Sequence, residues 1–402
     1  MSHSRPDGSG GDLPSFAVSF AFPLIFTTSL FQPDNPVLAT TMRRLEPDRR
    51  HRALFVVDDA VARTNPGLLG AIAGYVARHA GALELAGQPM VVTGGEAVKN
   101  DFSHTLELLT RINEVGLDRQ AFVVVIGGGA VLDMASFAAA IAHRGIRVVR
   151  VPTTVLAQGD SGVGVKNGIN FFGKKNFIGS FAPPFAVIND IAFLHSLPRR
   201  DRVAGAIEAV KVALLKDRPF FEFLEARADR IAAGDLDVLA PLVRRSAELH
   251  VAHICGNGDP FELGSARPLD FGHWAAHRLE SMTAHRLRHG EAVAIGIALD
   301  VVYSARRGFL AGSVADRILD ALERMGFALW DEALQATDAG GQSRLLAGLR
   351  EFREHLGGEL HVTLLRDIGH GFEVTAMDEA DVLASMKTLA ARQTRTLESG
   401  AR

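Results

Sequence analysis

The sequence has almost no cysteine and offers no clear membrane segment. Cys255 is the only cysteine, so an intramolecular disulfide and a cysteine-based metal framework are both excluded, as is usual for a reducing compartment. The apolar stretch 16–31 is shorter than the roughly 20 residues of a spanning helix and contains Pro23, so we expect one or two strands there. Only Arg5 precedes it as a basic flank, which disfavours an export signal. We therefore expect a cytoplasmic protein.

The sequence also lacks an excess of either charge. Lysine and arginine total 43 against 46 aspartates and glutamates, a net charge of -3, so no overall basic field attracts nucleic acid or a membrane. Any anion site must be local. A hydrophobic content of 47% and a length of 402 residues fit a globular chain of two domains of roughly 150 residues each.

Residues 50–160 alternate short apolar runs with helical segments. Runs rich in β-branched residues, separated by amphipathic helices, predict parallel strands buried on both faces of a doubly wound, mostly parallel α/β sheet. The expected strands are 53–59, 89–95, 122–129 and 148–154, and the expected helices lie near 66–80, 103–115 and 131–143.

The second half has a different composition, rich in Ala, Leu, Arg and Glu. Pro198 and a charged cluster at 197–201 separate this helix-rich part from the part with alternating strands and helices. We predict a flexible tail at 1–14, an α/β dinucleotide-binding domain at 15–198, and a mainly helical metal- and substrate-binding domain at 199–402. The expected helical stretches are 202–215, 219–233, 237–256, 271–285, 290–307 and 313–325.

A run of three glycines, Gly127, Gly128 and Gly129, follows the strand FVVVI and opens a helix that carries Asp133. Such a turn lets the backbone approach a diphosphate, and the helix N-terminus supplies free N–H donors. A strand-to-helix turn without a ligand is the alternative. Asp58, at the end of an earlier strand, suits a ribose-binding carboxylate or a helix cap equally well.

Polar residues that could bind anions or hydroxyls cluster after the other strands. Glu96 and Lys99 follow Gly95, where a solvated loop is the alternative. The segment from Asp160 to Asn176 interleaves lysines and asparagines with glycines, which indicates a local anion pocket or a hairpin with solvated lysines. Arg144, before the strand 148–154, could bind a phosphate or cap a helix.

In the helical half, His273 and His277 lie four residues apart on one predicted helix face, and His289 follows. Upstream, Glu208 and Lys211 share a face of another helix. A carboxylate with two imidazoles is a common open zinc set. A bare HxxxH pair is, however, often incidental.

In this order, the motifs resemble the sugar phosphate cyclase superfamily, whose central member is 3-dehydroquinate synthase. The likeness runs from FVVDD at 55–59 to LGGELHVTLLRDIG at 356–369. It implies an NAD- and metal-dependent carbon–oxygen lyase, with zinc or cobalt as the metal, that releases phosphate and closes a carbocycle by transient oxidation, elimination, re-reduction and aldol closure. It also implies a homodimer.

The residues implied for NAD are Asp58, Glu96, Lys99, Gly127, Gly128, Gly129, Asp133, Thr153 and Thr154. The implied metal ligands are Glu208, His273 and His289. The implied substrate contacts are Asp160, Lys166, Lys175, Asn176 and Lys211, with Arg144 on the phosphate and His277 assisting proton movement.

The sequence departs from 3-dehydroquinate synthase around the substrate carboxylate. Asp270 replaces an asparagine, and Ala252 stands where a lysine is expected. By count, Ala266 stands where an arginine is expected, with Arg267 one position away. Two like charges 4 Å apart repel by about 4 kcal/mol at an effective dielectric of 20, so Asp270 disfavours a keto-acid substrate and suits hydroxyls.

The pattern RPxDFGH resembles the 2-epi-5-epi-valiolone synthase branch, which implies sedoheptulose 7-phosphate as substrate. The segment 258–277 resembles an EboD-like bacterial subgroup. The alternatives are a 3-dehydroquinate synthase acting on a heptulosonate 7-phosphate, a metal-dependent alcohol or glycerol dehydrogenase, and a noncatalytic NAD-binding protein. The intact Glu208, His273 and His289 disfavour the noncatalytic protein.

Overall fold

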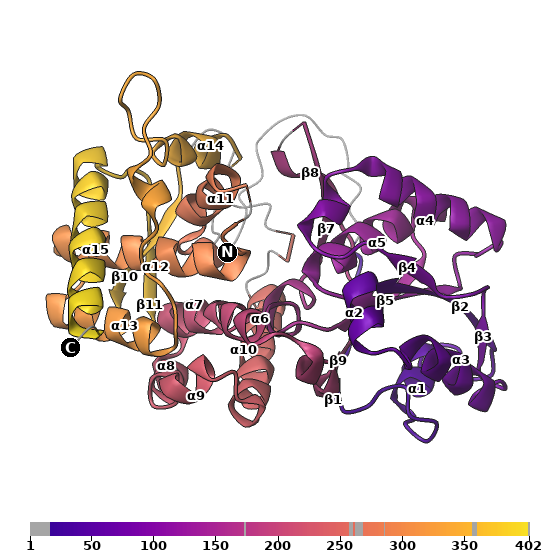
Figure 1. Ribbon diagram of the computed structural model, residues 1–402. Coiled ribbons are helices and arrows are strands. Elements are labelled where there is room, and N and C mark those ends of the chain that lie inside the picture. The colour runs from indigo at the N-terminus through magenta and orange to yellow at the C-terminus, as the bar shows by residue number, and fades with distance from the viewer. Residues whose placement is uncertain are drawn as a thin grey trace, which may run out of the picture.

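The computed structural model describes residues 17–172, 174–256, 260–261, 268–284, 286–355 and 360–400. Within them, seven strands form one parallel sheet in the order β1-β9-β6-β5-β2-β3, with β4 also paired to β2. This sheet occupies the first half of the chain, on the right of Figure 1. The strands are β1 (Leu24–Thr27), β2 (His51–Asp58), β3 (Leu83–Leu85), β4 (Met90–Val92), β5 (Phe122–Gly127), β6 (Arg147–Pro152) and β9 (Ala186–Asp190).

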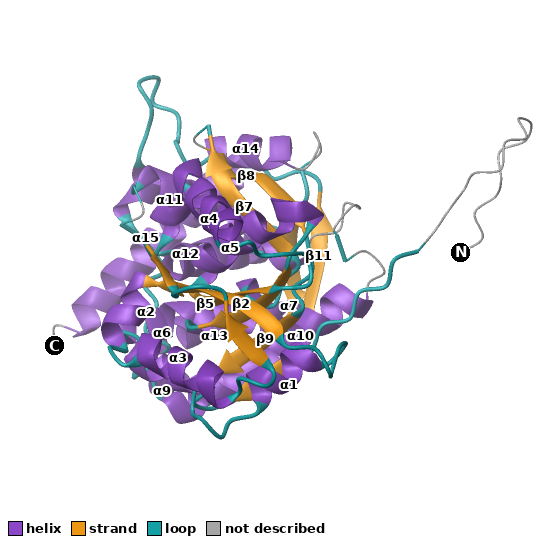
Figure 2. Ribbon diagram, turned by 90° about the vertical axis from the view of Figure 1, so that its right-hand side faces the viewer, coloured by secondary structure: helices purple, strands orange, loops and turns teal. Residues whose placement is uncertain are grey.

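Alternate residues of the central strands enter two separate apolar cores, one on each face of the sheet. Phe55 and Val124 point into the core shared with α1 and α3, whereas Val56 and Val125 point into the core shared with α4 and α5. Helices therefore cover both faces (Figure 2), which is why these strands read as unbroken apolar runs. The helices are α1 (Val37–Arg43), α3 (Leu68–Arg78), α4 (Phe102–Glu114) and α5 (Gly129–Ile141).

The predicted doubly wound fold is confirmed, and the differences in this half are local. The stretch 16–31 contains one short strand, β1. β3, a three-residue strand at the sheet edge, was not predicted. The segment from Asp160 to Asn176, for which a hairpin was one of two expectations, contains a separate antiparallel hairpin formed by β7 (Lys166–Phe171) and β8 (Lys174–Phe181). The predicted tail at 1–14 lies outside the described residues.

The second half is helical, with its own apolar core built around α7 and α12. Short connections at Ala206 and at 226–227 break two of the expected long helices into pairs. A hairpin of β10 (Val362–Asp367) and β11 (His370–Val374) is also present, which the composition of this half did not predict. The helices are α6 (Arg199–Gly205), α7 (Ile207–Lys216), α8 (Arg218–Glu225), α9 (Ala228–Ala232), α10 (Leu236–Gly256), α11 (His273–Met282), α12 (His289–Arg306), α13 (Gly312–Arg324), α14 (Ala347–His355) and α15 (Glu379–Gly400).

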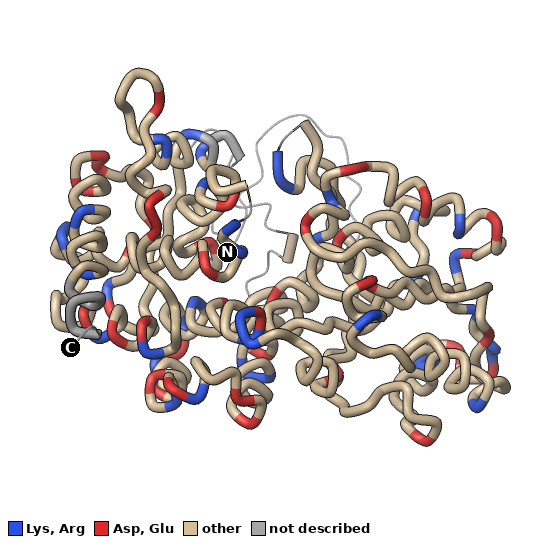
Figure 3. The backbone as a smooth tube through the Cα atoms, viewed as in Figure 1, with Lys and Arg blue, Asp and Glu red and all other residues tan. Residues whose placement is uncertain are grey.

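The surface charge is mixed. Figure 3 shows Lys and Arg interspersed with Asp and Glu over both halves, as the small net charge predicts. Among the described helices, none is both long enough and apolar enough to cross a membrane.

Candidate active site

The predicted nucleotide-binding residues gather at the carboxyl edge of the sheet. Gly127 ends β5 and Asp58 ends β2, and these two strands are neighbours. The chain runs outward from β2 to β4 on one side and from β5 to β6 on the other. Strand order thus reverses at this point, which is where doubly wound sheets bind ligands.

The glycine turn after β5 leaves the N-terminus of α5 open. Gly128 precedes α5 with φ -74° and ψ 172°, and no side chain caps the helix. A Cβ on Gly129 would lie 2.6 Å from Ser161 Oγ, so the Ser161 side chain would have to move to accommodate a larger residue. The buried hydroxyls of Thr153 and Ser161 have no hydrogen-bond partner in the described part of the chain. Uncapped N–H groups beside unpartnered hydroxyls fit a diphosphate.

Asp58 caps a helix while also facing the turn. Its Oδ1 accepts a hydrogen bond of 2.9 Å from the N–H of Ala60 in α2 (Asp59–Thr64). A Cβ on Gly94 would lie 2.3 Å from that same oxygen. Burial raises the pKa of Asp58 more than its hydrogen bonds from the backbone, including the one from Ala60, lower it. The geometry therefore supports the capping role directly and leaves the ribose role as a prediction.

A hydrogen-bond network joins the turn after β4 to the β7–β8 hairpin. Lys99 Nζ lies 2.7 Å from Asp133 Oδ2 and 2.5 Å from Asn176 Oδ1. The Asn170 amide donates to Glu96 Oε1 at 2.9 Å and accepts from the N–H of Asn176 at 2.9 Å. Residues implied for NAD are thus in direct contact with the hairpin that carries residues implied for substrate.

Glu208 on α7, His273 on α11 and His289 on α12 converge on one point. One potential ligand atom from each lies within 4.8 Å of the other two. Glu208 Oε1 is 3.9 Å from His273 Nε2 and 3.5 Å from His289 Nε2. Both oxygens of this buried carboxylate lack a well-directed hydrogen bond among the described residues. An open donor set of this kind fits a divalent metal.

Neighbouring groups orient both imidazoles. His273 Nδ1 lies 3.0 Å from the carbonyl oxygen of Phe271, and His289 Nδ1 lies 3.2 Å from Glu280 Oε2. Each Nδ1 is therefore engaged, and each Nε2 faces the carboxylate of Glu208. Outer partners of this type fix the ring and the tautomer that a metal requires.

A buried lysine balances the charge of the cluster. Lys211 Nζ lies 2.5 Å from Glu208 Oε2, and both side chains are almost fully buried. Burial alone would raise the pKa of Glu208, but Lys211 outweighs it and keeps the pKa below its usual value. Burial together with Lys211 lowers the pKa of His273 to about 4. His273 is therefore neutral at pH 7, as a metal ligand must be.

A close helix contact fixes the start of α11. Gly272 adopts a left-handed conformation with φ 77°, and a Cβ on Gly296 of α12 would lie 2.0 Å from the oxygen of Gly272. Asp300 of α12 accepts hydrogen bonds from the N–H of Gly272 at 3.0 Å and from Trp274 Nε1 at 2.9 Å. These contacts hold His273 in register with His289, because both histidines then belong to one packed helix pair.

Asp160 lies on a short π-helix, Ala157–Ser161, that follows β6. Its Oδ1 is 2.7 Å from His250 Nδ1 on α10. Burial by itself raises the pKa of Asp160, but the nearby charges of Lys211 and His250 lower it well below its usual range. Arg150, fully buried on β6, donates to the carbonyl oxygens of Gly162 and Gly164 at 3.2 and 2.6 Å. This arginine holds the loop that follows Asp160.

One ion pair connects the two halves beside the metal cluster. Lys175 Nζ on β8 lies 2.9 Å from Glu280 Oε1 on α11, and Glu280 also holds His289. His277 lies next to the cluster, with its ring centroid 5.5 Å from that of His273. Lys166, at the start of β7, is exposed.

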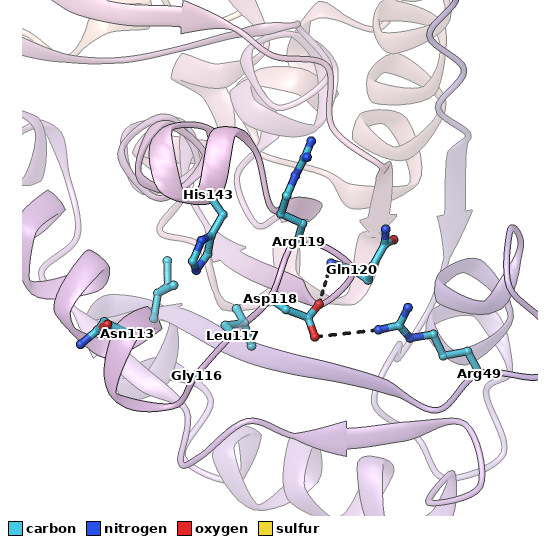
Figure 4. A pocket seen from close by; sticks show the side chains of 9 residues that line it. Arg49, Asn113, Gly116, Leu117, Asp118, Arg119, Gln120 and His143 are labelled. Carbon is cyan, nitrogen blue, oxygen red and sulfur yellow. Dashed lines mark hydrogen bonds and ion pairs between the residues drawn. The ribbon is translucent and has the colours of Figure 1, made fainter.

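Arg144 is the predicted residue that the structure does not bring to the site. It precedes β6, whereas Thr153 follows β6, so the six-residue strand separates them by about 20 Å. Within one chain, Arg144 therefore lies at the opposite edge of the sheet from Thr153, and its contact with phosphate stays a prediction. A shallow hollow lined by Arg49, Asp118 and His143 lies at that edge and does not include the candidate site (Figure 4).

The three residues that depart from the family pattern, Asp270, Ala252 and Ala266, lie in different surroundings. Asp270 lies close enough to Lys211 for its charge to raise the pKa of that lysine. Ala252 is exposed on α10, and His250, two residues earlier, carries the imidazole that reaches Asp160. Ala266 lies outside the described residues.

Glu280 and His250 were not predicted, and Asn170 was predicted only as a member of the segment from Asp160 to Asn176. Glu280 lies seven residues after His273, two helical turns along the same face, and this spacing could have revealed it. No comparable spacing signal links His250 to Asp160 or Asn170 to Glu96, because each pair is distant in the sequence.

Comparison with known proteins identifies the family. Residues 89–204 match the family described as "3-dehydroquinate synthase N-terminal", and residues 205–341 match "3-dehydroquinate synthase C-terminal". The chain is 41% identical to a 3-dehydroquinate synthase from Cereibacter sphaeroides, over 72% of this chain and 77% of that protein. It is 33% identical to a 3-dehydroquinate synthase from Rhodospirillum rubrum, over 91% and 95% of the two chains.

A solved structure agrees with this assignment. The 2-epi-5-epi-valiolone synthase from Streptomyces hygroscopicus, determined with NAD+ and Zn2+ bound, superposes with a TM-score of 0.83 at 27% identity, and 94% of this chain and 99% of that chain are covered. The family matches together span more than half of the sequence. The chain therefore belongs to the 3-dehydroquinate synthase family, within the sugar phosphate cyclase superfamily.

Proposed function

We propose that this enzyme converts sedoheptulose 7-phosphate to a C7 cyclitol with release of phosphate. The observation that carries this choice is Asp270, whose carboxylate lies near Lys211 and one turn before the metal-ligating His273. A neutral sugar hydroxyl can donate a hydrogen bond to this carboxylate. A substrate carboxylate at the same place would be repelled.

We propose that the chain binds a divalent metal through Glu208, His273 and His289, and NAD at the edge formed by β2 and β5. The convergence of Glu208 with His273 and His289 supports the metal, since one potential ligand atom of each lies within 4.8 Å of the others. The uncapped N-terminus of α5 and the hydroxyls of Thr153 and Ser161 support the dinucleotide. The same two cofactors are bound in the 2-epi-5-epi-valiolone synthase structure.

When bound, NAD supplies a reversible hydride acceptor, and the metal supplies Lewis acidity at the substrate carbinol. The protein groups orient the sugar between these two. Asp160 accepts a hydrogen bond from a sugar hydroxyl, and Lys211 keeps both Asp160 and Glu208 ionised. His277, beside the cluster, is placed to move a proton to or from the sugar ring.

The β7–β8 hairpin provides the phosphate contacts. Lys166, Lys175 and Asn176 lie on its two strands, and their donors suit three phosphate oxygens. Lys175 is paired with Glu280 in this structure. A bound phosphate would therefore compete with Glu280 for that lysine.

The second candidate is 3-dehydroquinate synthase itself. The relatives at 41% and 33% identity carry that name, and such an enzyme acts on a heptulosonate 7-phosphate. The imidazole of His250 does not replace the missing lysine as a carboxylate anchor, because its Nδ1 already contacts Asp160. We therefore place this activity second.

Phosphate release from the two sugars separates the candidates. Purified enzyme with NAD and Zn2+ is given sedoheptulose 7-phosphate or the heptulosonate 7-phosphate, while inorganic phosphate and NADH absorbance are recorded. We expect phosphate from the heptulose phosphate and no net NADH. Faster release from the heptulosonate would favour the second candidate, and accumulating NADH would favour a dehydrogenase.

Substituting Gly128 by valine tests the dinucleotide site. The backbone angles at Gly128 suit any residue, and a Cβ there would approach Thr154 no closer than 3.4 Å, so we expect the fold to be kept. The added methyl groups would occupy the space of the diphosphate. Overpacking costs about 1–3 kcal/mol, so the Kd of NAD should rise roughly 5- to 150-fold.

Calorimetric titration with NAD measures this change, and Gly74→Val on the exposed face of α3 is the matched control, since a Cβ there meets nothing within 4 Å. An unchanged Kd in Gly128→Val would assign the glycine turn to folding alone.

A further inference from the structure

His250 is an unassigned side chain that faces the candidate site from α10. Its Nδ1 lies 2.7 Å from Asp160 Oδ1, and the exposed fractions of the two side chains are 17% and 20%. The family resemblance gives position 250 no role, and the lysine that it would place on this helix is replaced by Ala252, which is exposed. The contact between His250 and Asp160 is therefore a feature of this chain's own residues.

Backbone packing fixes where His250 lies. α10 runs against the π-helix so closely that a Cβ on Gly159 would lie 3.3 Å from Ser246 Oγ. Ser246 and His250 are four residues apart, so they share one face of α10. That face meets Gly159 and Asp160 in turn, which leaves the imidazole little freedom to move away.

Asp160 has one oxygen held and one oxygen available. Oδ1 contacts His250, and no described residue hydrogen-bonds to Oδ2. An aspartate carboxylate rotates freely about its last torsion unless a partner holds it. The imidazole N–H of His250 supplies that partner, so Oδ2 keeps a constant direction.

We propose that His250 is a positioning residue that orients Asp160 toward a hydroxyl of the sugar phosphate. This proposal rests on the proposed function for the identity of the substrate, but the contact itself does not depend on it. The role requires an N–H donor at the Nδ1 position. The neutral tautomer with hydrogen on Nδ1 already supplies this donor to the carboxylate.

Two substitutions separate orientation from simple space filling. His250→Ala removes the donor, whereas His250→Asn places an amide N–H close to the former Nδ1. Loss of a hydrogen bond to a charged group should lower kcat/KM for sedoheptulose 7-phosphate by roughly 10- to 100-fold in His250→Ala. His250→Asn should recover most of that loss. The bound zinc and the Kd of NAD should stay as in the wild type, because His250 contacts neither expected site.

His253→Ala is the matched control. His253 lies on the same helix and its Nδ1 is 2.7 Å from Lys216 Nζ, outside the candidate site, so its loss should change kcat/KM less than about twofold. Equal activity of His250→Ala and wild type would overturn the proposal. Equal impairment of His250→Asn and His250→Ala would also overturn it, since it would show that the ring's volume matters rather than its N–H.

A crystal structure of His250→Ala tests the contact without activity. We expect the Asp160 carboxylate to take a different rotamer, and an unchanged rotamer would overturn the proposal. If the wild-type enzyme released no phosphate from any sugar phosphate, the proposed function would fail, and this structural result would still decide the role of His250.

Discussion

The substitution His289→Ala is expected to remove stoichiometric metal from the protein and to abolish turnover. His289 supplies one of three converging ligands, and a site left with Glu208 and His273 has too few donors to hold a catalytic ion. Loss of an outer-shell partner alone costs 10- to 100-fold. We therefore expect turnover to fall by more than about 100-fold when a ligand itself is lost.

The fold should survive this change. The His289 side chain is 31% exposed, and it lies at the first residue of α12, where alanine is well tolerated. Metal content by elemental analysis and the thermal midpoint measure the two effects. His277→Ala is the matched control, because His277 adjoins the cluster without belonging to it, and it should keep its metal. Full metal occupancy in His289→Ala would disprove the ligand assignment.

The substitution Asp270→Asn is expected to lower kcat/KM for sedoheptulose 7-phosphate by roughly 10- to 100-fold. A neutral amide oxygen accepts a hydroxyl hydrogen bond more weakly than a carboxylate does. The substitution also removes a negative charge that raises the pKa of Lys211. The change should not create activity on the heptulosonate, since the lysine expected at Ala252 is still missing.

Initial rates of phosphate release measure this effect. Asp316→Asn on α13 provides the control, because that carboxylate is 74% exposed and lies 3.9 Å from Arg392, and it should behave as the wild type. If Asp270→Asn left the heptulose rate unchanged, Asp270 would not contact the substrate, and the charge argument for the heptulose phosphate would lose its basis.

Strong local patterns made the parallel sheet predictable. Unbroken runs such as FVVVI at 122–126 can only be buried on both faces, and the glycines that follow mark the turn. The metal cluster was predicted from the family resemblance, not from spacing, because Glu208 and His273 are 65 positions apart. The helix pair that joins His273 to His289 depends on the contact between Gly272 and Gly296, which a single sequence does not show.

Features set by tertiary contacts escaped prediction. β3 has three residues, too few for a periodicity signal. The π-helix at 157–161 has no sequence signature of its own, although it brings Asp160 to His250. The phosphate role of Arg144 was implied by the family resemblance, and the direction of β6, which places Arg144 at the edge opposite Thr153, has no signal in the sequence. The buried arginine near the site, Arg150, was hidden inside an apolar strand.

The most direct test of the central claim is the mass of the product together with its stoichiometry. The enzyme is incubated with sedoheptulose 7-phosphate, Zn2+ and less NAD than substrate, and product, phosphate and NADH are quantified together. The account predicts one phosphate per product, a product mass equal to substrate minus one phosphoric acid, many turnovers per NAD and no accumulated NADH. A product that keeps its phosphate and has lost two hydrogens, with one NADH formed per product, would contradict it.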